Sequence, residues 1–343
     1  LVLADAPVVS PPPPPAADPA EAVPDDASGD TAEQPEAPAP VEFQEFGAWT
    51  IDPDVIVSSP PHTVPAEAGD WWGDYIVPSG ITTDRYIQAI QTKAGDLRVV
   101  HHALTYGVTD PESPLSDSSS DAFLNEYAVG KNADVYPDGT GRLLEADARV
   151  RFSFHYHSVG EEVTEQTELG MVLYPEGYDP DHILYSRQLG QAGELDIPAG
   201  QVTRHDGYTK MYLPGKLTGF QPHMHFRGSR MLLEAIHADG RRQVLTDVPR
   251  YEQVWQLTYP YQEPHLFPAG TVLHSVAWHD NTAANKHNPD PSAWIGWGSR
   301  TMDDMGNAWT DIAFMTEEQY QVRLKDKLAR LANPERAKTN EGQ

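Results

Sequence analysis

The sequence predicts a mainly β protein built from two tandem antiparallel β-sandwich domains of the jelly-roll type, and three observations support this prediction. Apolar and polar residues alternate with a period of two in several runs, as expected for strands with one buried face. Turn-forming pairs such as Asp138-Gly139 and Asp239-Gly240 separate the runs. Helical crossovers do not alternate with them, which argues against a parallel α/β sheet.

Two runs combine this alternation with histidines. In the run 149–157, one face of the predicted strand carries Val150, Phe152, Phe154 and Tyr156. The opposite face carries Arg149, Arg151, Ser153, His155 and His157. The run 220–227 repeats the arrangement, with Phe220, Pro222, Met224 and Phe226 opposite Gln221, His223, His225 and Arg227. Each run therefore places histidines on a polar face above an apolar one.

Further strands are predicted at 98–106, 169–174, 230–237, 251–259 and 271–279. The C-terminal segment predicts a helix instead. Thr316 and Gln319 form a capping-box pattern, and basic residues crowd the last turns before Pro334. Apolar residues recur there at helical spacing, at Tyr320, Leu324, Leu328 and Leu331.

Changes in composition predict the domain boundaries. The first 40 residues hold 11 of the 31 prolines, eight acidic residues and no basic residue, so we expect residues 1–42 to form a proline-rich, acidic, extended tail. Glycine and proline interrupt the strand pattern near 186–196. We therefore expect the first sandwich at 43–190 and the second at 191–316, followed by a C-terminal helix and tail at 317–343.

Charge and hydropathy exclude several classes of partner. The formal net charge is −27, from 51 acidic and 24 basic residues, and such a surface repels the phosphates of nucleic acids. No run approaches the 18 or so apolar residues that a transmembrane helix needs. Residue 1 is leucine rather than methionine, so we expect the mature or trimmed product of an exported protein, periplasmic or extracellular.

The residue types also limit the metal chemistry. Cysteine is absent, which excludes disulfides, thiolate metal sites and cysteine nucleophiles. Any metal must then bind histidine, carboxylate or methionine. His223 and His225 are two residues apart, as are His155 and His157, so each pair can share one face of a strand.

Two other interpretations of the histidines stay open from spacing alone. His101 and His102 are adjacent, so in a regular strand they point to opposite faces and could share a metal only at a strand end, a bulge or a strong twist. All of these histidines could instead be polar-face residues that make ordinary hydrogen bonds.

Four short motifs carry a resemblance to a known family. They are His101-His102-Ala103-Leu104, His155-Tyr156, Pro222-His223-Met224-His225-Phe226-Arg227-Gly228 and Asp303-Asp304-Met305. In this order and at these separations they resemble the copper motifs of the copper type II, ascorbate-dependent monooxygenases. These are the peptidylglycine α-hydroxylating and dopamine β-monooxygenases, and the resemblance is closest to their bacterial relatives. It covers roughly residues 43–316.

The resemblance implies two copper ions per chain and an external reductant such as ascorbate. The electron-donating copper of the first domain would be bound by His101, His102 and His155. The catalytic, oxygen-binding copper of the second domain would be bound by His223, His225 and Met305. These ligand types suit copper, because imidazole binds both oxidation states and a thioether favours Cu(I). Methionine is otherwise most often a core residue.

Departures from the family pattern bear on the substrate. Gln221 and Trp309 stand where the peptide-hydroxylating members have an arginine and a tyrosine that hold a substrate carboxylate, and Ser153 replaces a glutamine. Asn307 matches a third anchoring position, but one amide does not replace an arginine fork. We therefore expect a substrate pocket at Gln221, Asn307 and Trp309 that takes a small, more apolar molecule and not a peptidylglycine.

Two classes of function follow from these observations. The first is a copper- and reductant-dependent monooxygenase, an oxidoreductase that hydroxylates its substrate with dioxygen. The second is a non-catalytic, extrinsic periplasmic subunit of a membrane-bound photosynthetic or electron-transfer complex that retains the monooxygenase fold. Residues 1–40 motivate the second class, because an acidic polyproline segment suits attachment to a protein partner. A copper carrier is a third interpretation, for which two unlike sites are unnecessary.

Overall fold

The computed structural model describes residues 47–110, 122–128, 131–190 and 194–332. The chain divides into two units between Phe43 and Gln44, and every described residue belongs to the second unit, Gln44–Gln343. The predicted proline-rich tail, residues 1–42, lies outside the described residues, as does the end of the C-terminal segment, 333–343.

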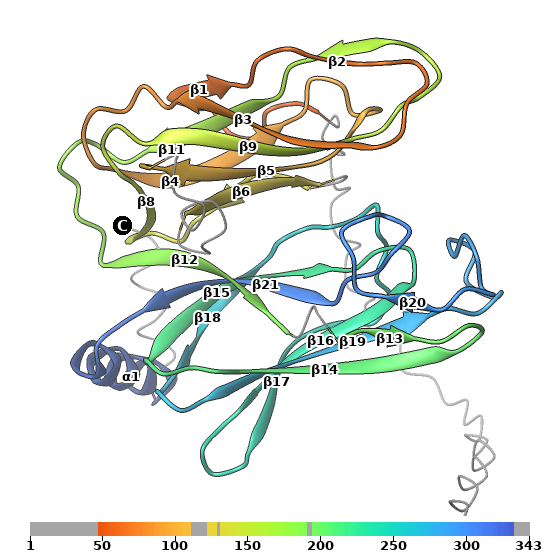
Figure 1. Ribbon diagram of the computed structural model, residues 1–343. Helices are drawn as coiled ribbons and strands as arrows, with labels where there is room; N and C mark the ends of the chain where they lie inside the picture. Colours follow the sequence, from red (N-terminus) through yellow and green to blue (C-terminus); the bar gives the residue numbers. More distant parts are fainter. Residues whose placement is uncertain (1–46, 111–121, 129–130, 191–193, 333–343) are drawn as a thin grey trace, which may run out of the picture. The chain divides into compact units, whose positions relative to one another are not determined.

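The first sandwich is formed by the strands between Val55 and Leu173 (Figure 1). They are β1 (Val55–Ser58), β2 (His62–Val64), β3 (Trp71–Pro78), β4 (Arg85–Lys93), β5 (Val100–Val108), β6 (Phe123–Ala128), β7 (Asp134–Val135), β8 (Thr140–Leu144), β9 (Arg149–Tyr156), β10 (Val163–Glu165) and β11 (Glu168–Leu173). One layer has the strand order β3-β9-β5-β6 and the other has β1-β11-β4-β8, with β7 beside β4. The short strands β10 and β2 pair with each other.

The second sandwich is formed by the strands between His182 and Phe314 (Figure 1). They are β12 (His182–Leu189), β13 (Asp196–Ile197), β14 (Val202–Lys210), β15 (Gly215–His223), β16 (Gly228–Ile236), β17 (Arg242–Val248), β18 (Tyr259–Phe267), β19 (Val272–Asp280), β20 (Ile295–Gly296) and β21 (Asn307–Phe314). Its layers have the strand orders β14-β19-β16-β17 and β12-β21-β15-β18. A short pair, β13-β20, accompanies them.

Buried side chains from both layers meet inside each sandwich. In the first, the core includes Phe152 and Phe154 of β9 together with Ile87 of β4. In the second, it includes Leu233 of β16 and Phe220 of β15. Burial of each such side chain contributes about 1.5–3 kcal/mol to folding. The predicted mainly β, sandwich-type fold is confirmed.

One short parallel pairing connects the strands of the two sandwiches. In it, His182 of β12 pairs with Thr140 of β8, and Ile183 pairs with Gly141. Every other pairing between the named strands of the described residues is antiparallel. A single hydrogen-bonded series, β1-β11-β4-β8-β12-β21-β15-β18, therefore runs through both sandwiches.

Most of the predicted strands appear with slightly shifted ends, but two predictions need correction. The segment 251–259 is not a strand: β18 begins only at Tyr259, and the N–H of Trp255 donates to the carbonyl of Glu252 in a turn (2.9 Å). The hydroxyl of Tyr251 bonds instead to both backbone polar groups of Met224. The second correction is that β15 ends at His223, so His225 lies beyond the predicted strand.

The predicted C-terminal helix is α1 (Glu317–Ala332). Its capping box is formed as expected: the N–H of Gln319 donates to Oγ1 of Thr316 (3.2 Å), and the N–H of Thr316 donates to Oε1 of Gln319 (2.8 Å). Tyr320 is buried, whereas Leu328 on the same helix is exposed. Among the described residues, no helix is long and apolar enough to cross a membrane.

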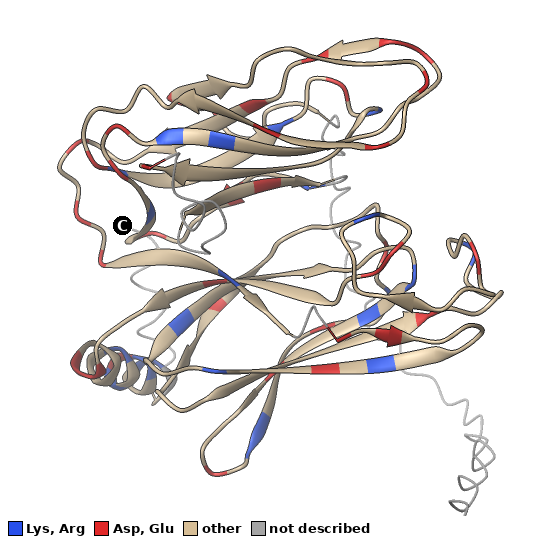
Figure 2. Cartoon of the chain, viewed as in Figure 1, with Lys and Arg blue, Asp and Glu red and all other residues tan. Residues whose placement is uncertain are grey.

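Acidic and basic side chains are interspersed over loops and strands in the view of Figure 2. Several form surface ion pairs, such as Arg230 with Asp247 (2.7 Å). Exposed pairs of this kind contribute only about 0–1 kcal/mol each. The two apolar cores, rather than surface charge pairing, therefore account for most of the stability.

Candidate metal centre

A β-bulge brings the adjacent histidines of the first set together. In the pairing of β5 with β9, Val100 lies opposite Tyr156 and His102 lies opposite His155, so the register shifts at His101. A bulge allows two neighbouring residues to face a single partner residue. His101, His102 and His155 each offer one ring nitrogen, and these three nitrogens lie within 4.8 Å of one another.

The same ring nitrogen of His101 and of His155, Nε2, contacts a residue outside the first set. Nδ1 of His101 faces Nδ1 of His102 at 3.2 Å. The Nε2 atoms are engaged elsewhere: that of His101 lies 3.2 Å from Oγ1 of Thr301, and that of His155 lies 3.0 Å from Oδ2 of Asp70. Nδ1 of His155 is buried and has no hydrogen-bond partner among the described residues. Because the carboxylate of Asp70 accepts, Nε2 of His155 carries the proton, and the Nδ1 lone pair of His155 is free to bind a metal.

The surroundings of the first set keep its imidazoles neutral. Burial, together with smaller contributions from the neighbouring His155 and His157, lowers the pKa of His101 to about 3. Burial also holds the pKa of His102 well below its ordinary value. For His155, burial lowers the pKa and outweighs the opposing effect of Asp70. Neutral imidazole is the form that binds metals.

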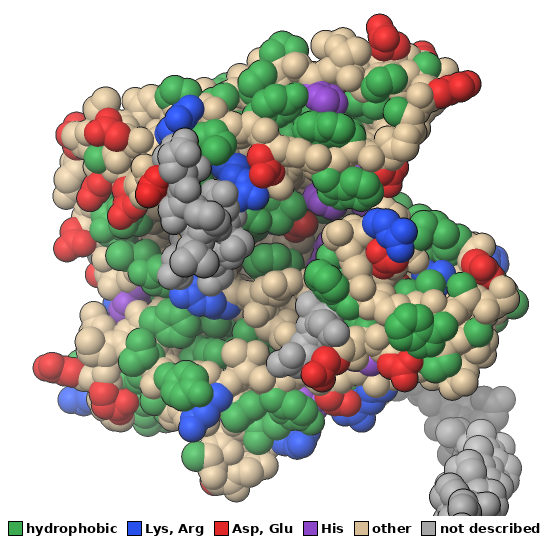
Figure 3. Space-filling view, viewed as in Figure 1, with side chains coloured by type: hydrophobic (Ala, Val, Ile, Leu, Met, Phe, Trp, Pro, Cys, Tyr) green, Lys and Arg blue, Asp and Glu red, His purple; other side chains and the backbone are tan. Residues whose placement is uncertain are grey.

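His157 stands beside the first set rather than within it. Its ring centre lies 6.0 Å from that of His101, compared with 4.8 Å for His155. Trp72 of β3 stacks on His155 with 4.3 Å between ring centres, which fixes the plane of that imidazole. An open pocket of about 400 Å³ borders this set and is lined by His101, His155, His157, Asp70, Phe226, Gln253, Val254, Gln256 and Thr301. Histidine side chains are visible in an indentation of the surface shown in Figure 3.

The second set is arranged by a buried carboxylate. Oδ1 of Asp304 accepts hydrogen bonds from the N–H groups of His225 and Met305, both at 2.9 Å. Its Oδ2 accepts from the N–H of Arg227 at 3.0 Å. Burial by itself raises the pKa of Asp304, but the hydrogen bond from His279 and the nearby His225 hold it below its usual value. An ionised Asp304 thus connects the turn after β15 to Met305.

The free nitrogens of the second set differ from those of the first. Nδ1 of His223 lies 2.6 Å from Oε1 of Gln256, and Nδ1 of His225 lies 3.1 Å from the carbonyl oxygen of Asp303. Both Nδ1 atoms then carry protons, so both Nε2 atoms are available. The ring centres of His223 and His225 are 5.5 Å apart although His225 lies beyond the strand. Burial lowers the pKa of His225 to about 4, with a further contribution from His223.

One pocket of about 280 Å³ unites the second set with a residue of the first. It is lined by His223, His225 and Met305 and also by His102, Leu104, Tyr106, Phe123, Glu126, Gln188, Ser299, Asn307 and Trp309. Two of the three predicted substrate residues, Asn307 and Trp309, therefore line it. Gln221 does not: its Nε2 donates to Oε2 of Glu126 (2.8 Å), a carboxylate that does line the pocket.

The pocket walls combine aromatic rings with hydrogen-bond acceptors. Phe123 stacks on Trp309 at 5.0 Å, and Tyr106 packs edge-on against Phe123 at 5.7 Å. Glu126 is 5% exposed, and Asn307 is 3% exposed with an Oδ1 that has no hydrogen-bond partner among the described residues. No lysine or arginine lines the pocket in the described part of the chain.

Sequence reasoning missed the residues that orient the ligands. Asp70, Gln256 and Thr301 lie far along the chain from the histidines that they contact. No local pattern marks them, because each contact depends on tertiary structure. Asp304 belongs to a quoted motif, but its role as an acceptor for three backbone N–H groups is visible only in the structure.

The donor atoms of both sets fit copper. Three neutral imidazoles that converge within 4.8 Å suit copper in either oxidation state. Two imidazoles with a thioether suit Cu(I), because sulfur is a soft ligand. Nδ1 of His155 is buried and has no hydrogen-bond partner among the described residues. Buried polar atoms are rarely left unpaired, so this nitrogen fits the role of a metal ligand.

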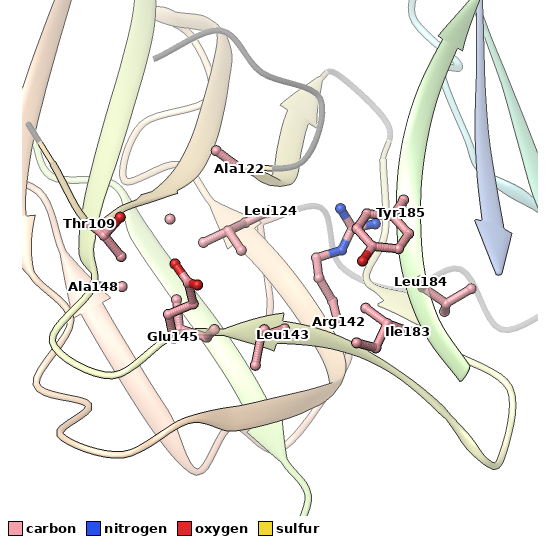
Figure 4. A pocket seen from close by; sticks show the side chains of 12 residues that line it. Thr109, Ala122, Leu124, Arg142, Leu143, Glu145, Ala148, Ile183, Leu184 and Tyr185 are labelled. Carbon is pink, nitrogen blue, oxygen red and sulfur yellow. The ribbon is translucent and has the colours of Figure 1, made fainter. Parts of the chain in front are cut away.

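A third pocket, of about 340 Å³, has different chemistry (Figure 4). Arg142 and Tyr185 lie at one end of it, and Thr109 and Glu145 lie at the other. The guanidinium of Arg142 already donates to Tyr136, Ser186, Asp311 and the carbonyl of Phe123. Among the described residues that line it, this pocket therefore offers no converging ligand set and no unpaired cation.

We expect the metal-free protein to lose stability as the pH falls from about 6.5 to about 4. In that window the unfolded chain protonates its histidines, whereas the depressed pKa values of His101 and His225 keep them neutral in the fold. The unfolded state then binds more protons, so stability falls with pH. Urea unfolding midpoints at a series of pH values measure the effect. In the His101→Gln variant the pH slope should be smaller, and an equal slope would contradict the expectation.

No protein-family model matches this chain, and no curated protein matches it. Solved structures that resemble it include the VP2 subviral particle of infectious bursal disease virus, with 10% sequence identity, 85% of this chain and 91% of that chain covered, and a TM-score of 0.19. The structure of the Gx strain of the same virus has 8% identity, the same coverage of 85% and 91%, and a TM-score of 0.18. Similarity at this level indicates nothing about function.

Proposed function

We propose that this chain binds two copper ions and, with an external reductant such as ascorbate, hydroxylates a substrate other than a peptidylglycine with dioxygen. One observation carries the proposal: ring nitrogens of His101, His102 and His155 lie within 4.8 Å of one another, and the pocket lined by His223, His225 and Met305 also includes His102 of the first set. Copper at such sites would supply one-electron chemistry between Cu(I) and Cu(II), which the side chains themselves lack.

The residues of the chain would orient the ligands and the substrate. Asp70 fixes which ring nitrogen of His155 is free, and Gln256 and the Asp303 carbonyl do so for His223 and His225, whereas Thr301 orients the ring of His101. Outer hydrogen bonds of this kind set the tautomer and the orientation of metal-binding histidines. Trp309, stacked on Phe123, supplies a rigid apolar wall beside Met305.

The polarity of the pocket favours one kind of substrate. Glu126 and the unpaired Oδ1 of Asn307 are acceptors, and the described lining has no cation for a carboxylate. A buried acceptor that stays unpaired costs about 1–3 kcal/mol. An apolar molecule with a positively charged or hydrogen-bond-donating group would pair both acceptors, whereas a carboxylate would be repelled by Glu126.

Metal analysis combined with oxygen uptake tests the proposal. We expect two copper equivalents per chain and ascorbate-dependent oxygen uptake that rises with an apolar primary amine but not with an N-acylglycine. Glu126→Gln should weaken the response to the amine, and the exposed Glu162→Gln serves as its matched control. If the protein binds copper but takes up no oxygen under any of these conditions, the proposed monooxygenase activity is contradicted and the extrinsic-subunit alternative is favoured.

A further inference from the structure

A braced loop precedes Met305, and we call residues 297–304 the bridging loop. A backbone bridge between Trp297 and Asp304 closes it, and the N–H of Gly298 donates to the carbonyl of Asp304 (3.1 Å). Inside it, Arg300 donates to both carboxylate oxygens of Asp303, at 2.6 and 2.9 Å. A Cβ at Gly298 would come within 2.2 Å of Oδ2 of Asp303, so the side chain of Asp303 would have to shift to admit one. These contacts connect the two ends of the loop and its interior.

One side of the bridging loop contacts the first ligand set. Oγ1 of Thr301 lies 3.2 Å from Nε2 of His101, across 200 residues of sequence. Nδ1 of His101 faces Nδ1 of His102 at 3.2 Å, on the other side of the ring. The hydroxyl of Thr301 therefore holds the imidazole in the orientation that points Nδ1 toward the other ligands of the first set.

The same loop contacts the second ligand set. The carbonyl oxygen of Asp303 accepts from Nδ1 of His225 (3.1 Å), and the carbonyl oxygen of Met302 accepts from Nη1 of Arg227 (3.0 Å). Asp304 accepts from the backbone of both His225 and Met305. Met305 follows the loop directly. Thus a single segment, closed at its ends, contacts one ligand of the first set and two ligands of the second.

We propose that the bridging loop couples the two copper sites, so that copper bound at either site strengthens copper binding at the other, with Thr301 as the positioning residue. The proposal rests on the proposed function, because it needs both sites to bind copper. Filling the second site fixes His225 and Met305, and through them the bridging loop. Thr301 is then held in place, so His101 and its partner Thr301 lose less conformational freedom when His101 binds its metal. Thermodynamic linkage makes the effect equal in both directions.

The test separates the sites by deleting a ligand that the bridging loop does not touch. His223→Ala weakens the second site but keeps the loop contacts to His225, since His223 bonds to Gln256 instead. Full-length, metal-free protein with carbon-labelled histidine is titrated anaerobically with Cu(I) against a competing chelator. The NMR signal of His155 then reports the filling of the first site. The five chains compared are the wild type, His223→Ala, Thr301→Val, Thr301→Ser and the double variant His223→Ala/Thr301→Val.

We expect His223→Ala to lower the Cu(I) affinity of the first site by about 5-fold or more, the lower end of ordinary coupling. Thr301→Val should lower it by about 10-fold, as loss of an outer partner does. Adding His223→Ala to Thr301→Val should then change nothing further, and Thr301→Ser should behave as the wild type. The proposed coupling is wrong if the first site binds Cu(I) equally well with and without His223. It is also wrong if His223→Ala still lowers the affinity of the first site when Thr301 is already replaced by valine. Absence of Cu(I) binding in the wild type would instead overturn the proposed function itself.

Discussion

Replacement of Arg142 by methionine is expected to lower the free energy of unfolding by about 3–5 kcal/mol, the usual cost of removing one member of a buried ion pair. Nη2 of Arg142 in β8 lies 3.0 Å from Oδ1 of Asp311 in β21, and only 4% of the arginine side chain and 15% of the aspartate side chain are exposed. Nη1 also donates to the carbonyl oxygen of Phe123 (2.6 Å). The variant would leave Asp311 buried without its charged partner, although Ser186 still donates to its Oδ1, and the carbonyl of Phe123 would lose the hydrogen bond from Arg142.

Calorimetric and urea unfolding of Arg142→Met measure this loss. Arg241→Ala is the matched control, because Arg241 and Asp239 form an exposed pair whose loss should change stability by no more than about 1 kcal/mol. Arg142→Met/Asp311→Leu should regain part of the loss, since it removes both charges. A stability of Arg142→Met within 1 kcal/mol of the wild type would show that this pair does not join the strands as described.

The loss in Arg142→Met should also depend on pH. Burial raises the pKa of Asp311, and the opposing attraction of Arg142 disappears in the variant. In the folded variant Asp311 then binds a proton more readily than in the unfolded chain, so folding gains stability as the pH falls. The deficit relative to the wild type should therefore shrink on acidification. A deficit that grows instead would show that Asp311 does not carry the effect.

His155→Ala is expected to lose one of two copper equivalents, with the affinity of the first site falling by more than about 100-fold, because loss of an outer partner alone costs 10–100-fold. His155 supplies a ring nitrogen to the cluster within 4.8 Å and keeps Nδ1 unpaired. His157→Ala is the control, since its ring lies 6.0 Å from that of His101 and belongs to the pocket wall.

Copper analysis after dialysis against a chelator, together with circular dichroism, distinguishes the two variants. His157→Ala should retain both equivalents, whereas His155→Ala should retain only that of the second site. Equal loss in both variants, with the fold intact, would mean that the wrong member of the pair has been assigned as the ligand. Loss of both equivalents in His155→Ala would contradict separate sites.

Local patterns predicted the strands because alternation depends only on neighbouring residues. In β9 the burial of Val150, Phe152 and Phe154 follows the predicted face. The strand prediction for 251–259 was wrong because Tyr251 bonds to Met224, a contact that no period-two pattern reveals. For Gln221, a position in the pocket wall was expected. Gln221 instead bonds to Glu126, and it is Glu126 that lines the pocket.

The sequence by itself determined the mainly β class, the capped C-terminal helix and the residue types that could bind a metal without cysteine. These features arise from interactions over a few residues, which a linear pattern records. Only the tertiary structure decided that a bulge brings His101 beside His102, that Thr301 contacts His101, and that the carbonyl of Asp303 leaves Nε2 of His225 free. Strand register and hydrogen bonds across 78 to 200 residues are properties of the packed chain, because they exist only once distant segments meet.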